Sequence, residues 1–550
     1  MSRPHGEPVE PEREDTASPE ERAESVEVSS AGASVAEVSS TDASSASASS
    51  AAAASADGAS ADAASAEGSS AGASSPGVSA SAASPSERPA LGWTPNRRLL
   101  LALVVLAIVT RLLWVLWLHP NGDYVFSDMK KYVHRAQDLV EHGIHPHRTL
   151  AWQAWGTHYV LALPLKLFGK GALVAAAVLW GLLAALAVPG GYLLACRVSS
   201  RRWMPPVVGV LLLLWYPNLS NSGYFLSEAP FLCFQLWSTL WLVMVLQQGK
   251  RPLLAGLASA AAFAVRPQSA LFFVLVLGTW LINRRRLPHV RLRQLGLVAA
   301  PLLAMLAFSL WRFDYHTDQG LGVAENANMN LTAGRCHNIV TQAFHTPRQL
   351  RASQRRGNTR NGRRVSLPGF RVLARSVRPD HPLALRPAMN SETLRMVGYI
   401  GDAAVHRELR EECYRRTGWL EQTRYSMVNM TLLWAIGHQW PEQSRGAKYF
   451  RPPADAYKYF YLGFIWIPSL LGLLAAVVWV RRRPGLGFCA WQLVTSMTVA
   501  AIFFGTIRLR TPYDPYAMVL ALEGWALAWL LVRLGLQRLR SAQPAPKTTP

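Results

Sequence analysis

Charged residues are scarce in this chain, and their scarcity argues against an ordinary soluble protein of this length. Only 16% of the 550 residues are Asp, Glu, Lys or Arg, whereas 50% are hydrophobic and 20 are Trp. The hydrophobic residues come in runs of about 18 to 25, the length that an α-helix needs to cross a hydrocarbon core. Such runs leave no polar face for water. The composition therefore predicts an integral membrane protein.

The sequence also lacks the loops that many nucleotide-driven and hydrolytic enzymes use. It has no Gly-rich phosphate loop and no Gly-x-Ser-x-Gly elbow between a predicted strand and helix, which argues against a nucleotide-driven pump or a typical serine hydrolase. The net charge is +22, yet no segment resembles a nucleic-acid-binding module. Arginine clusters at the ends of apolar runs are typical of cytoplasmic topology signals, and they also attract anionic lipid phosphates.

Aromatic residues are absent before Trp93, and residues 1–92 are predicted to form a disordered cytoplasmic tail. Residues 1–90 are rich in Ala and Ser and contain 15 Asp/Glu against 4 Arg. A segment of this composition buries too little apolar surface to offset its chain entropy. It has no basic start followed by an apolar core, so we do not expect a signal peptide.

The basic residues predict the topology of the rest of the chain. Arg97 and Arg98 precede the first apolar run, so the chain emerges outside near His119 and both termini are cytoplasmic. The later arginine clusters lie inside together only if residues 157–168 do not cross, so we expect that short segment to be re-entrant or interfacial. The fold class is then an all-α polytopic membrane protein with about 10 to 11 transmembrane helices and one large mixed extracytoplasmic loop. Ten crossings are expected, at 99–118, 172–196, 205–222, 229–247, 252–266, 269–283, 294–312, 457–480, 485–505 and 514–532.

This topology divides the chain into five parts: the tail 1–92, an N-terminal transmembrane catalytic module 93–312 with the first outer loop, an extracytoplasmic loop 313–456, C-terminal transmembrane helices 457–535 and a cytoplasmic tail 536–550. The large loop carries 21 Lys/Arg against 12 Asp/Glu, the reverse of the usual bias. The positive-inside tendency is weak in long loops, so we keep the loop outside. Within it we expect a helix at 399–422 and an apolar segment at 427–440 that rests on the membrane surface.

Cysteine is rare, with five residues in the whole chain. Cys196, Cys233 and Cys489 lie within apolar runs, where cysteine is typically a packing residue. Cys336 and Cys413 lie in the large loop and are candidates for a disulfide if that loop faces an oxidising compartment. The sequence alone leaves their pairing open.

Two acidic residues stand where helices are expected to begin on the outer side. Asp128 follows Ser127, an expected N-cap, so its carboxylate lies in the first turn of a surface helix with Tyr132 on the same face. The alternative is a carboxylate that only stabilises the helix terminus. Glu228 lies at the entrance to a span, where a charged side chain is energetically costly unless it is solvated or takes part in function. The alternative role of Glu228 is to cap that helix.

Three arginines occupy positions where the topology disfavours positive charge. Arg266 lies at membrane depth or near the outer surface, and Pro267 ends the apolar run just after it. Arg508 and Arg510 lie on the outer turn before the last span, and a phosphate between them would explain both through charge-assisted hydrogen bonds. The alternative for this pair is an ion pair with Asp514.

Four histidines, His142, His145, His147 and His158, lie close together in the first outer loop. Their spacing fits no common zinc pattern, and their surroundings are loop-like. We therefore expect no cofactor, and a divalent metal is left as an alternative that the sequence does not support.

Several short segments resemble the C-type (GT-C) membrane glycosyltransferases, in particular the protein O-mannosyltransferase and aminoarabinose-transferase branch that uses polyprenyl-phosphate sugars. Residues 127–136 are similar to the acidic first-loop motif, and residues 156–169 to the "PPG…H…L…lfG" stretch that follows it. Residues 508–515 are similar to the "RYRLP…P" segment before the last span. The turn at 264–267 matches a common Arg-Pro of the group.

The resemblance covers roughly residues 95–535 and implies inverting transfer of a sugar from polyprenyl phosphate to a cell-envelope acceptor, a glycan, lipid or protein, on the extracytoplasmic face. Its partners would be membrane lipids, the lipid-linked donor and an acceptor, without nucleic acid. The Ala/Arg/Gly-rich composition suggests a bacterium, in which the membrane is the inner one. A lipid or amphipath transporter and a non-catalytic membrane scaffold are the rival functions, although no pair of similar halves typical of transporters is evident.

The resemblance also implies a role for each candidate residue. Many relatives have two adjacent acids in the first loop, whereas Met129 follows Asp128 here. Asp123 is therefore an alternative to Asp128 as the general base that removes the acceptor's proton. The implied roles are general base for Asp128, orientation of its partners or of the acceptor for Glu228, stabilisation of the departing phosphate for Arg266, Arg508 and Arg510, and substrate binding for Tyr132 and His158.

Overall fold

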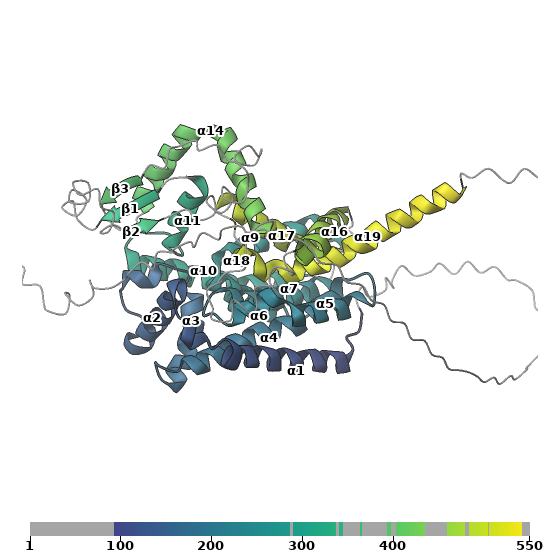
Figure 1. The fold of residues 1–550 in the computed structure, drawn as a ribbon, viewed down its shortest axis with the longest axis horizontal. Helices are drawn as coiled ribbons and strands as arrows, with labels where there is room; N and C mark the ends of the chain where they lie inside the picture. Colours follow the sequence, from purple (N-terminus) through teal and green to yellow (C-terminus); the bar gives the residue numbers. More distant parts are fainter. Residues whose placement is uncertain are drawn as a thin grey trace, which may run out of the picture. The chain divides into compact units, whose positions relative to one another are not determined.

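The computed structural model describes residues 93–286, 290–336, 340–344, 363–365, 393–397, 403–434, 459–478, 483–503, 505 and 507–541. This part of the chain is mainly helical (Figure 1). The predicted tail 1–92 and residues 542–550 lie outside it, so the expectation of disorder in the N-terminal tail stays a prediction.

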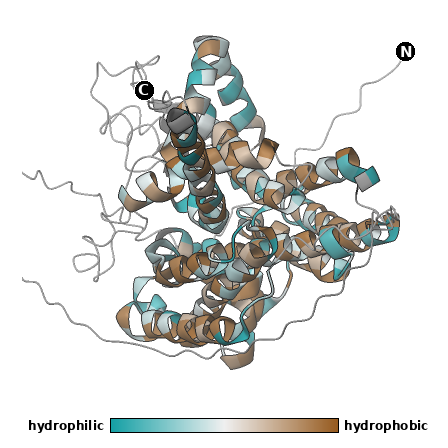
Figure 2. Ribbon diagram, turned by 90° about the vertical axis from the view of Figure 1, so that its right-hand side faces the viewer, coloured by the Kyte–Doolittle hydropathy of each residue, from teal (hydrophilic) through white to brown (hydrophobic). Residues whose placement is uncertain are grey.

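Within the described residues, seven helices are long and apolar enough to cross a membrane, and each coincides with a predicted crossing. Figure 2, coloured by hydropathy, shows apolar stretches along many of the helices. The seven are α1 (Arg97–Leu113) with its extension to Leu118, α4 (Leu173–Val198), α7 (Glu228–Gln248), α10 (Leu292–Thr317), α16 (Ile467–Val478) with the turn from Tyr461, α17 (Pro484–Ile502) and α19 (Asp514–Ser541) with the turns from Arg508.

Three shorter apolar helices, α5 (Met204–Leu214), α8 (Pro252–Val265) and α9 (Ala270–Asn283), occupy the other predicted crossings. The prediction of one continuous helix at 205–222 is wrong. Trp215 has an extended backbone (φ −69°, ψ 101°), so α5 stops before it and a separate helix, α6 (Tyr216–Ser222), follows. Arg111 of α1 donates hydrogen bonds to the carbonyls of Leu212 and Leu213 at 2.9 and 2.7 Å, which satisfies acceptors at the broken end of α5.

The order of helix packing places α7 at the centre of the bundle. α1 packs on α4, α4 on α7, α7 on α8, and α8 on α10. In the most apolar stretch of α7, 83% of the residues are buried, against 6% in α10. α10 therefore lies at the rim, where Leu303 and Trp311 are exposed.

The first predicted outer loop contains two helices. α2 (Ser127–His142) packs on α3 (Gly156–Phe168), and α3 packs on α4 and α8. A Cβ added at Gly156 would lie 2.5 Å from the carbonyl carbon of Ala264, so only glycine permits this close approach of α3 to the end of α8. The re-entrant or interfacial placement of α3 stays a prediction.

The described parts of the loop 313–456 include a small sheet that the sequence analysis did not predict. Its central strand, β1 (Val340–Phe344), pairs antiparallel with β2 (Arg363–Val365) and parallel with β3 (Thr393–Val397). Thr341 lies opposite Val365 on one side and Leu394 on the other.

The two segments predicted at 399–422 and 427–440 are, where described, two helical halves that meet at a kink at Gly418, earlier in the chain than the predicted division. α14 (Ala403–Trp434) is continuous except for a break at Gly418, whose φ is 69°. The residues after the break pack on α17 and on the short helix α18 (Ile507–Arg510). Tyr425, Val428 and Leu432 are buried, so this half of α14 contacts the protein, and its placement on the membrane surface stays a prediction.

Cys336 and Cys413 form a disulfide, with Cα atoms 5.5 Å apart. The bond connects the residue after α11 (Asn326–Arg335) to α14, and both cysteines are buried. Cys196, Cys233 and Cys489 are buried free thiols, as the packing role predicts.

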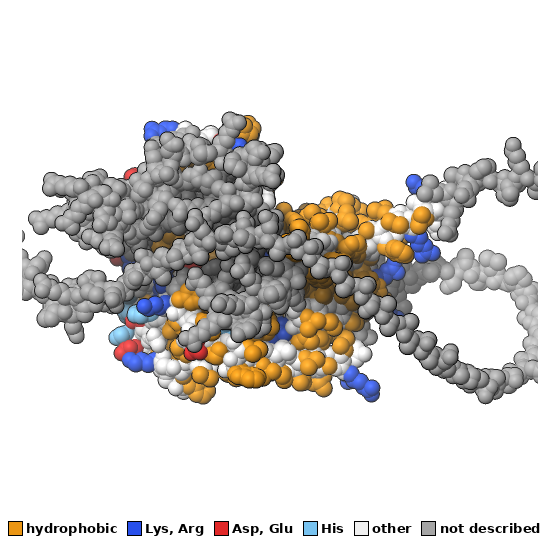
Figure 3. Space-filling view, in the orientation of Figure 1, with side chains coloured by type: hydrophobic (Ala, Val, Ile, Leu, Met, Phe, Trp, Pro, Cys, Tyr) orange, Lys and Arg blue, Asp and Glu red, His pale blue; other side chains and the backbone are white. Residues whose placement is uncertain are grey.

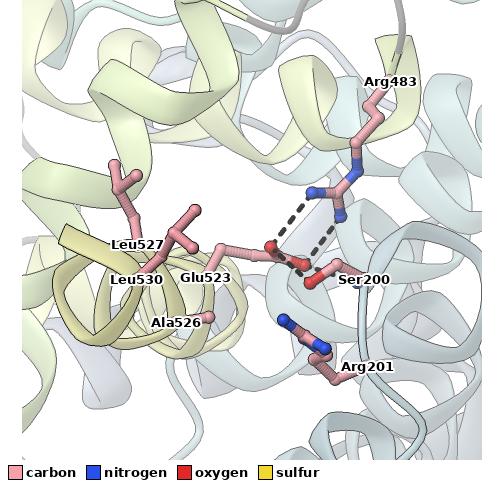
Figure 4. Close-up of a pocket in the computed structure, with 7 residues that line it drawn as sticks. All are labelled: Ser200, Arg201, Arg483, Glu523, Ala526, Leu527 and Leu530. Carbon is pink, nitrogen blue, oxygen red and sulfur yellow. Dashed lines mark hydrogen bonds and ion pairs between the residues drawn. The ribbon is translucent and has the colours of Figure 1, made fainter. Parts of the chain in front are cut away.

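A charged cluster lies beyond the carboxyl end of α7, at the end of the bundle predicted to be cytoplasmic (Figure 4). Arg483 donates to both carboxylate oxygens of Glu523 at 2.7 and 3.0 Å, and Ser200 donates to the same two oxygens from its backbone nitrogen and hydroxyl at 2.7 and 2.9 Å. These bonds connect the loop after α4, the start of α17 and the middle of α19. Arg201 and Leu527 also line the pocket beside the cluster.

Candidate functional site

Four helix ends bring charged residues together at the opposite end of α7. Asp128 lies in the first turn of α2, Glu228 in the first turn of α7, Arg266 directly after α8, and Arg508 in α18. We call these four residues the ion cluster. Both carboxylates are in the first turns of helices, where the partial positive charge of the helix terminus stabilises them.

The start of α2 differs slightly from the prediction. The helix begins at Ser127 itself, and Phe126, with an extended backbone, is the residue before it, so the prediction of Ser127 as N-cap is wrong by one residue. Asp128 is still in the first turn, as predicted.

Arg266 is positioned by the proline that follows it. A residue before proline is disfavoured in the helical conformation, and Arg266 has an extended backbone (φ −144°, ψ 99°) between α8 and the turn at Pro267. Its Nε and Nη2 donate to the hydroxyl of Ser227 at 3.0 and 2.9 Å, and Nη2 also donates to Glu228 Oε1 at 2.5 Å.

Arg508 connects the two carboxylates. Its Nε donates to Glu228 Oε1, and its Nη1 donates to Asp128 Oδ2 at 3.1 Å. The Lys131 amine lies 3.8 Å from the other oxygen of Asp128. Three cations, including Arg266, thus surround two carboxylates, and this balance favours an anionic ligand.

Burial is graded across the ion cluster. The side chain of Glu228 is 1% exposed, that of Arg508 is 18% exposed, and that of Asp128 is 32% exposed. Glu228 is therefore at the bottom of the cluster and Asp128 is its accessible member. Within the described residues, Glu228 Oε2 and Arg266 Nη1 are buried without a hydrogen-bond partner. Because buried polar atoms are normally paired, these two are free to contact a polar ligand.

The surroundings of Asp128 keep its carboxylate ionised. Burial by itself would raise the pKa of Asp128, but the charges of Arg508 and Lys131, with the hydrogen bond from Arg508, outweigh it and hold the pKa below its usual value. Tyr132, one turn further along α2, is buried, and burial together with the charge of Asp128 raises the pKa of its phenol. Tyr132 therefore stays protonated beside the cluster.

Arg510 has other partners than Arg508. Its Nε donates to Asp514 Oδ1 at 3.2 Å, and its guanidinium carbon lies 3.8 Å from the centre of the Tyr461 ring. This is the alternative arrangement that the sequence left open, since residues four apart are neighbours on a helix surface. Both partners of the ion pair are buried, so Arg510 serves the packing of α19.

His158 is a core residue in α3. Its Nε2 lies 3.2 Å from Nη2 of Arg312, which also donates to the carbonyl of Leu150 at 3.0 Å. Burial, followed by the charge of Arg312, lowers the pKa of His158 well below its usual value, so the ring is neutral and accepts the bond. Among the described residues, His158 thus contacts Arg312 of α10 and no member of the ion cluster.

Sequence reasoning missed two members of the surroundings of the cluster. Ser227 holds Arg266, and Lys131 approaches Asp128. Both are adjacent to predicted residues, one directly before Glu228 and the other one turn after Asp128. Their adjacency to charged residues at the start of a helix is the signal that could have identified them.

The same approach missed Asp138, which the structure brings close to His145 and His147. The histidine set considered from the sequence is therefore divided, with His158 in the core and the others near the end of α2.

The chain matches no protein-family model and no curated protein.

Proposed function

We propose that the chain is a polytopic protein of a bacterial inner membrane, with both termini cytoplasmic, and that it transfers a sugar from polyprenyl phosphate to an envelope acceptor on the extracytoplasmic face. The seven long apolar helices support the membrane location, and α5, α8 and α9 are the additional crossings. The ion cluster and the Arg483–Glu523 pair are at opposite ends of α7, which fits one catalytic face and one cytoplasmic face.

The observation that carries the proposal is the cluster itself. Arg508 is held by two carboxylates at the end of an apolar bundle, and Arg266 beside it has a buried donor without a partner among the described residues. A lipid-linked phosphate has its charged head at such a position while its tail stays in the bilayer. Guanidinium groups are well suited to a phosphate because they donate paired hydrogen bonds in a planar arrangement.

The reaction needs a base for the acceptor and a cation for the leaving group. An acceptor hydroxyl oxygen attacks the anomeric carbon, and its proton passes to the carboxylate of Asp128. The bond between that carbon and the phosphate oxygen breaks, and its electron pair leaves with the phosphate. Arg508 and Arg266 stabilise the charge that develops on that oxygen, and the anomeric configuration is inverted.

Arg508 couples the two halves of this reaction. The guanidinium of Arg508 lowers the pKa of Asp128, which makes the carboxylate a weaker base. When a donor phosphate accepts hydrogen bonds from Arg508, the attraction between Arg508 and Asp128 decreases and the carboxylate becomes more basic. Glu228 keeps Arg508 in place throughout because Glu228 is buried beneath it. Donor binding therefore raises the pKa of Asp128 and makes it a stronger base.

The experiment is reconstitution of the full chain in lipid vesicles with a radiolabelled polyprenyl-phosphate hexose and an envelope extract as the source of acceptors. We expect labelled hexose in the acceptor fraction and release of polyprenyl phosphate. Movement of intact donor across the bilayer without any transferred hexose would instead establish a lipid transporter and contradict the proposal.

A matched pair of variants tests the leaving-group site. Arg266 and Arg251 flank α8 at its two ends, and Arg251 is exposed. Arg266→Gln removes a donor to the developing charge, so transfer should decrease about a hundredfold, the typical loss for one such donor. Arg251→Gln should leave the rate unchanged. Equal rates for the two variants, both folded by their unfolding midpoints, would remove Arg266 from the site.

A further inference from the structure

The turn that follows α2 gathers metal-ligating side chains away from the ion cluster. Asp138 lies near the end of α2, and His145 and His147 follow in the next segment. One ligand atom from each of the three residues lies within 4.8 Å of the others. Figure 3 shows histidine and acidic side chains together at the end of the molecule that carries α2 in the matching view of Figure 1.

Gly143 is the residue that turns the chain back. It follows α2 with φ 70° and ψ −153°, a conformation that residues with a side chain rarely adopt. The reversal places His145 against Asp138, with Nε2 of the histidine 3.4 Å from Oδ2 of the carboxylate. A tetrahedral zinc ion bound at about 2.0 to 2.2 Å by both atoms would hold them about 3.4 Å apart.

The Nδ1 atoms of His145 and His147 and the Oδ1 atom of Asp138 are within hydrogen-bond distance of neighbouring groups. Nδ1 of His145 lies 3.2 Å from the carbonyl of Gly143, and Nδ1 of His147 lies 2.5 Å from the hydroxyl of Thr149. Oδ1 of Asp138 lies 3.1 Å from Nδ1 of His142. Ligating histidines typically have one ring nitrogen fixed in this way while the other binds the metal. The arrangement thus leaves Nε2 of both histidines and Oδ2 of Asp138 for an ion.

We propose that Asp138, His145 and His147 bind a divalent transition metal of the zinc class, and that His142 orients the carboxylate. Two imidazoles and one carboxylate suit zinc and cobalt better than magnesium or calcium, which prefer oxygen ligands. Three protein ligands leave the fourth position open to water. The side chain of His145 is 28% exposed, so an ion has access from solvent. The proposal does not rest on glycosyl transfer.

The test measures metal binding by the full chain, purified without a histidine tag, stripped with chelator and dialysed against zinc. We expect the wild type to retain one zinc ion that His145→Ala and His147→Ala each bind at least a hundredfold more weakly. His142→Ala should lose about tenfold, as an outer-sphere partner does. The matched control is His134→Ala, an exposed histidine on α2, which should bind zinc like the wild type.

Cobalt(II) gives a second readout. Visible absorption bands of tetrahedral cobalt should appear on titration of the wild type and be absent in His145→Ala. The metal-free variants should elute and unfold like the wild type, because the ligands are partly exposed. Zinc retention equal in the wild type, His145→Ala and His147→Ala, or no retention by the wild type, would overturn the proposal.

Discussion

At the scale of single residues, Arg508 determines the electrostatics of the ion cluster. It contacts a buried carboxylate and a more exposed one through different nitrogens. The buried carboxylate, Glu228, also accepts a hydrogen bond from Arg266, so the two guanidiniums share one oxygen. Among the described residues, the ion-pair contacts of Asp128 are with Arg508 and Lys131, at 3.1 and 3.8 Å. It is therefore the carboxylate that a ligand can most readily release from its cation.

The pH dependence of transfer tests this relation. A general base works in its ionised form, and the pKa of Asp128 lies below its usual 3.8, so the wild-type kcat/KM for the donor, which reports the free enzyme, should decline only below that pH. Arg508→Gln removes the largest effect that lowers the pKa, and burial then raises it. The acid limb of the rate profile should move to higher pH in this variant, and less in Lys131→Gln. Superimposable acid limbs in all three proteins would show that Arg508 does not set the protonation of Asp128.

The sequence identifies residues of this kind one at a time. Glu228, Arg266 and Arg508 each place a charge near the end of an apolar run, whereas Asp128 lies in the first turn of a polar surface helix. The sequence does not specify which of them meet. Arg508 and Arg510 were indistinguishable by spacing, yet one contacts Asp128 and the other contacts Asp514 one turn further along. Only the packing of α18 against its neighbours separates them.

At the scale of elements, the packing of α16 on α19 depends on two glycines. A Cβ added at Gly524 would lie 1.9 Å from the carbonyl oxygen of Pro468, and one added at Gly472 would lie 2.0 Å from the carbonyl oxygen of Leu520. Small residues allow helix backbones to approach this closely in membrane proteins. α19 leads on from the turn that carries Arg508, so this contact also supports the cluster.

Two glycines of α19 give a matched comparison of stability. Gly524→Ala should lower the free energy of unfolding by about 1 to 3 kcal/mol, because the methyl group has no space between the helices. In the described part of the chain, no atom lies within 4 Å of a Cβ added at Gly535. Gly535→Ala should therefore raise the free energy of unfolding by about 0.5 to 1 kcal/mol through helix propensity. Thermal unfolding in detergent measures both. A Gly524→Ala variant as stable as the wild type would show that the helices are further apart.

The length of apolar runs predicted the long helices well, because a run of that length has few other stable structures. The predictions failed where a local break in the helical backbone or a tertiary contact determines the bounds of an element or the residues that meet. The extended backbone of Trp215 divides the predicted span at 205–222. In the large loop the helix break falls at Gly418, before the predicted division, and the half after it packs on α17 and α18. The strands of the outer loop have only three to five residues, too few for alternation to identify them. Asp138 was missed because the turn at Gly143, not the spacing, brings it to His145.

At the scale of the whole molecule, the proposed topology places two exposed residues on opposite sides of the membrane. Asp123 lies in the first outer loop, and Arg201 lies beside the Arg483–Glu523 pair. The chain's own cysteines do not interfere, because three are buried and two form a disulfide. In intact cells, an impermeant maleimide should label Asp123→Cys, and it should label Arg201→Cys only after lysis. Labelling of both from the same side would refute the topology.

The central claim is that the accessible carboxylate of the ion cluster removes the proton of the acceptor. The most direct measurement is hexose transfer from polyprenyl phosphate by reconstituted wild type, Asp128→Asn and Asp123→Asn. Asp123 is the exposed acid five residues earlier and is the matched control. Asp128→Asn should reduce the transfer rate by about 10²- to 10⁴-fold, the usual contribution of a general base, and Asp123→Asn should equal the wild type. Transfer by Asp128→Asn at the wild-type rate would contradict the account.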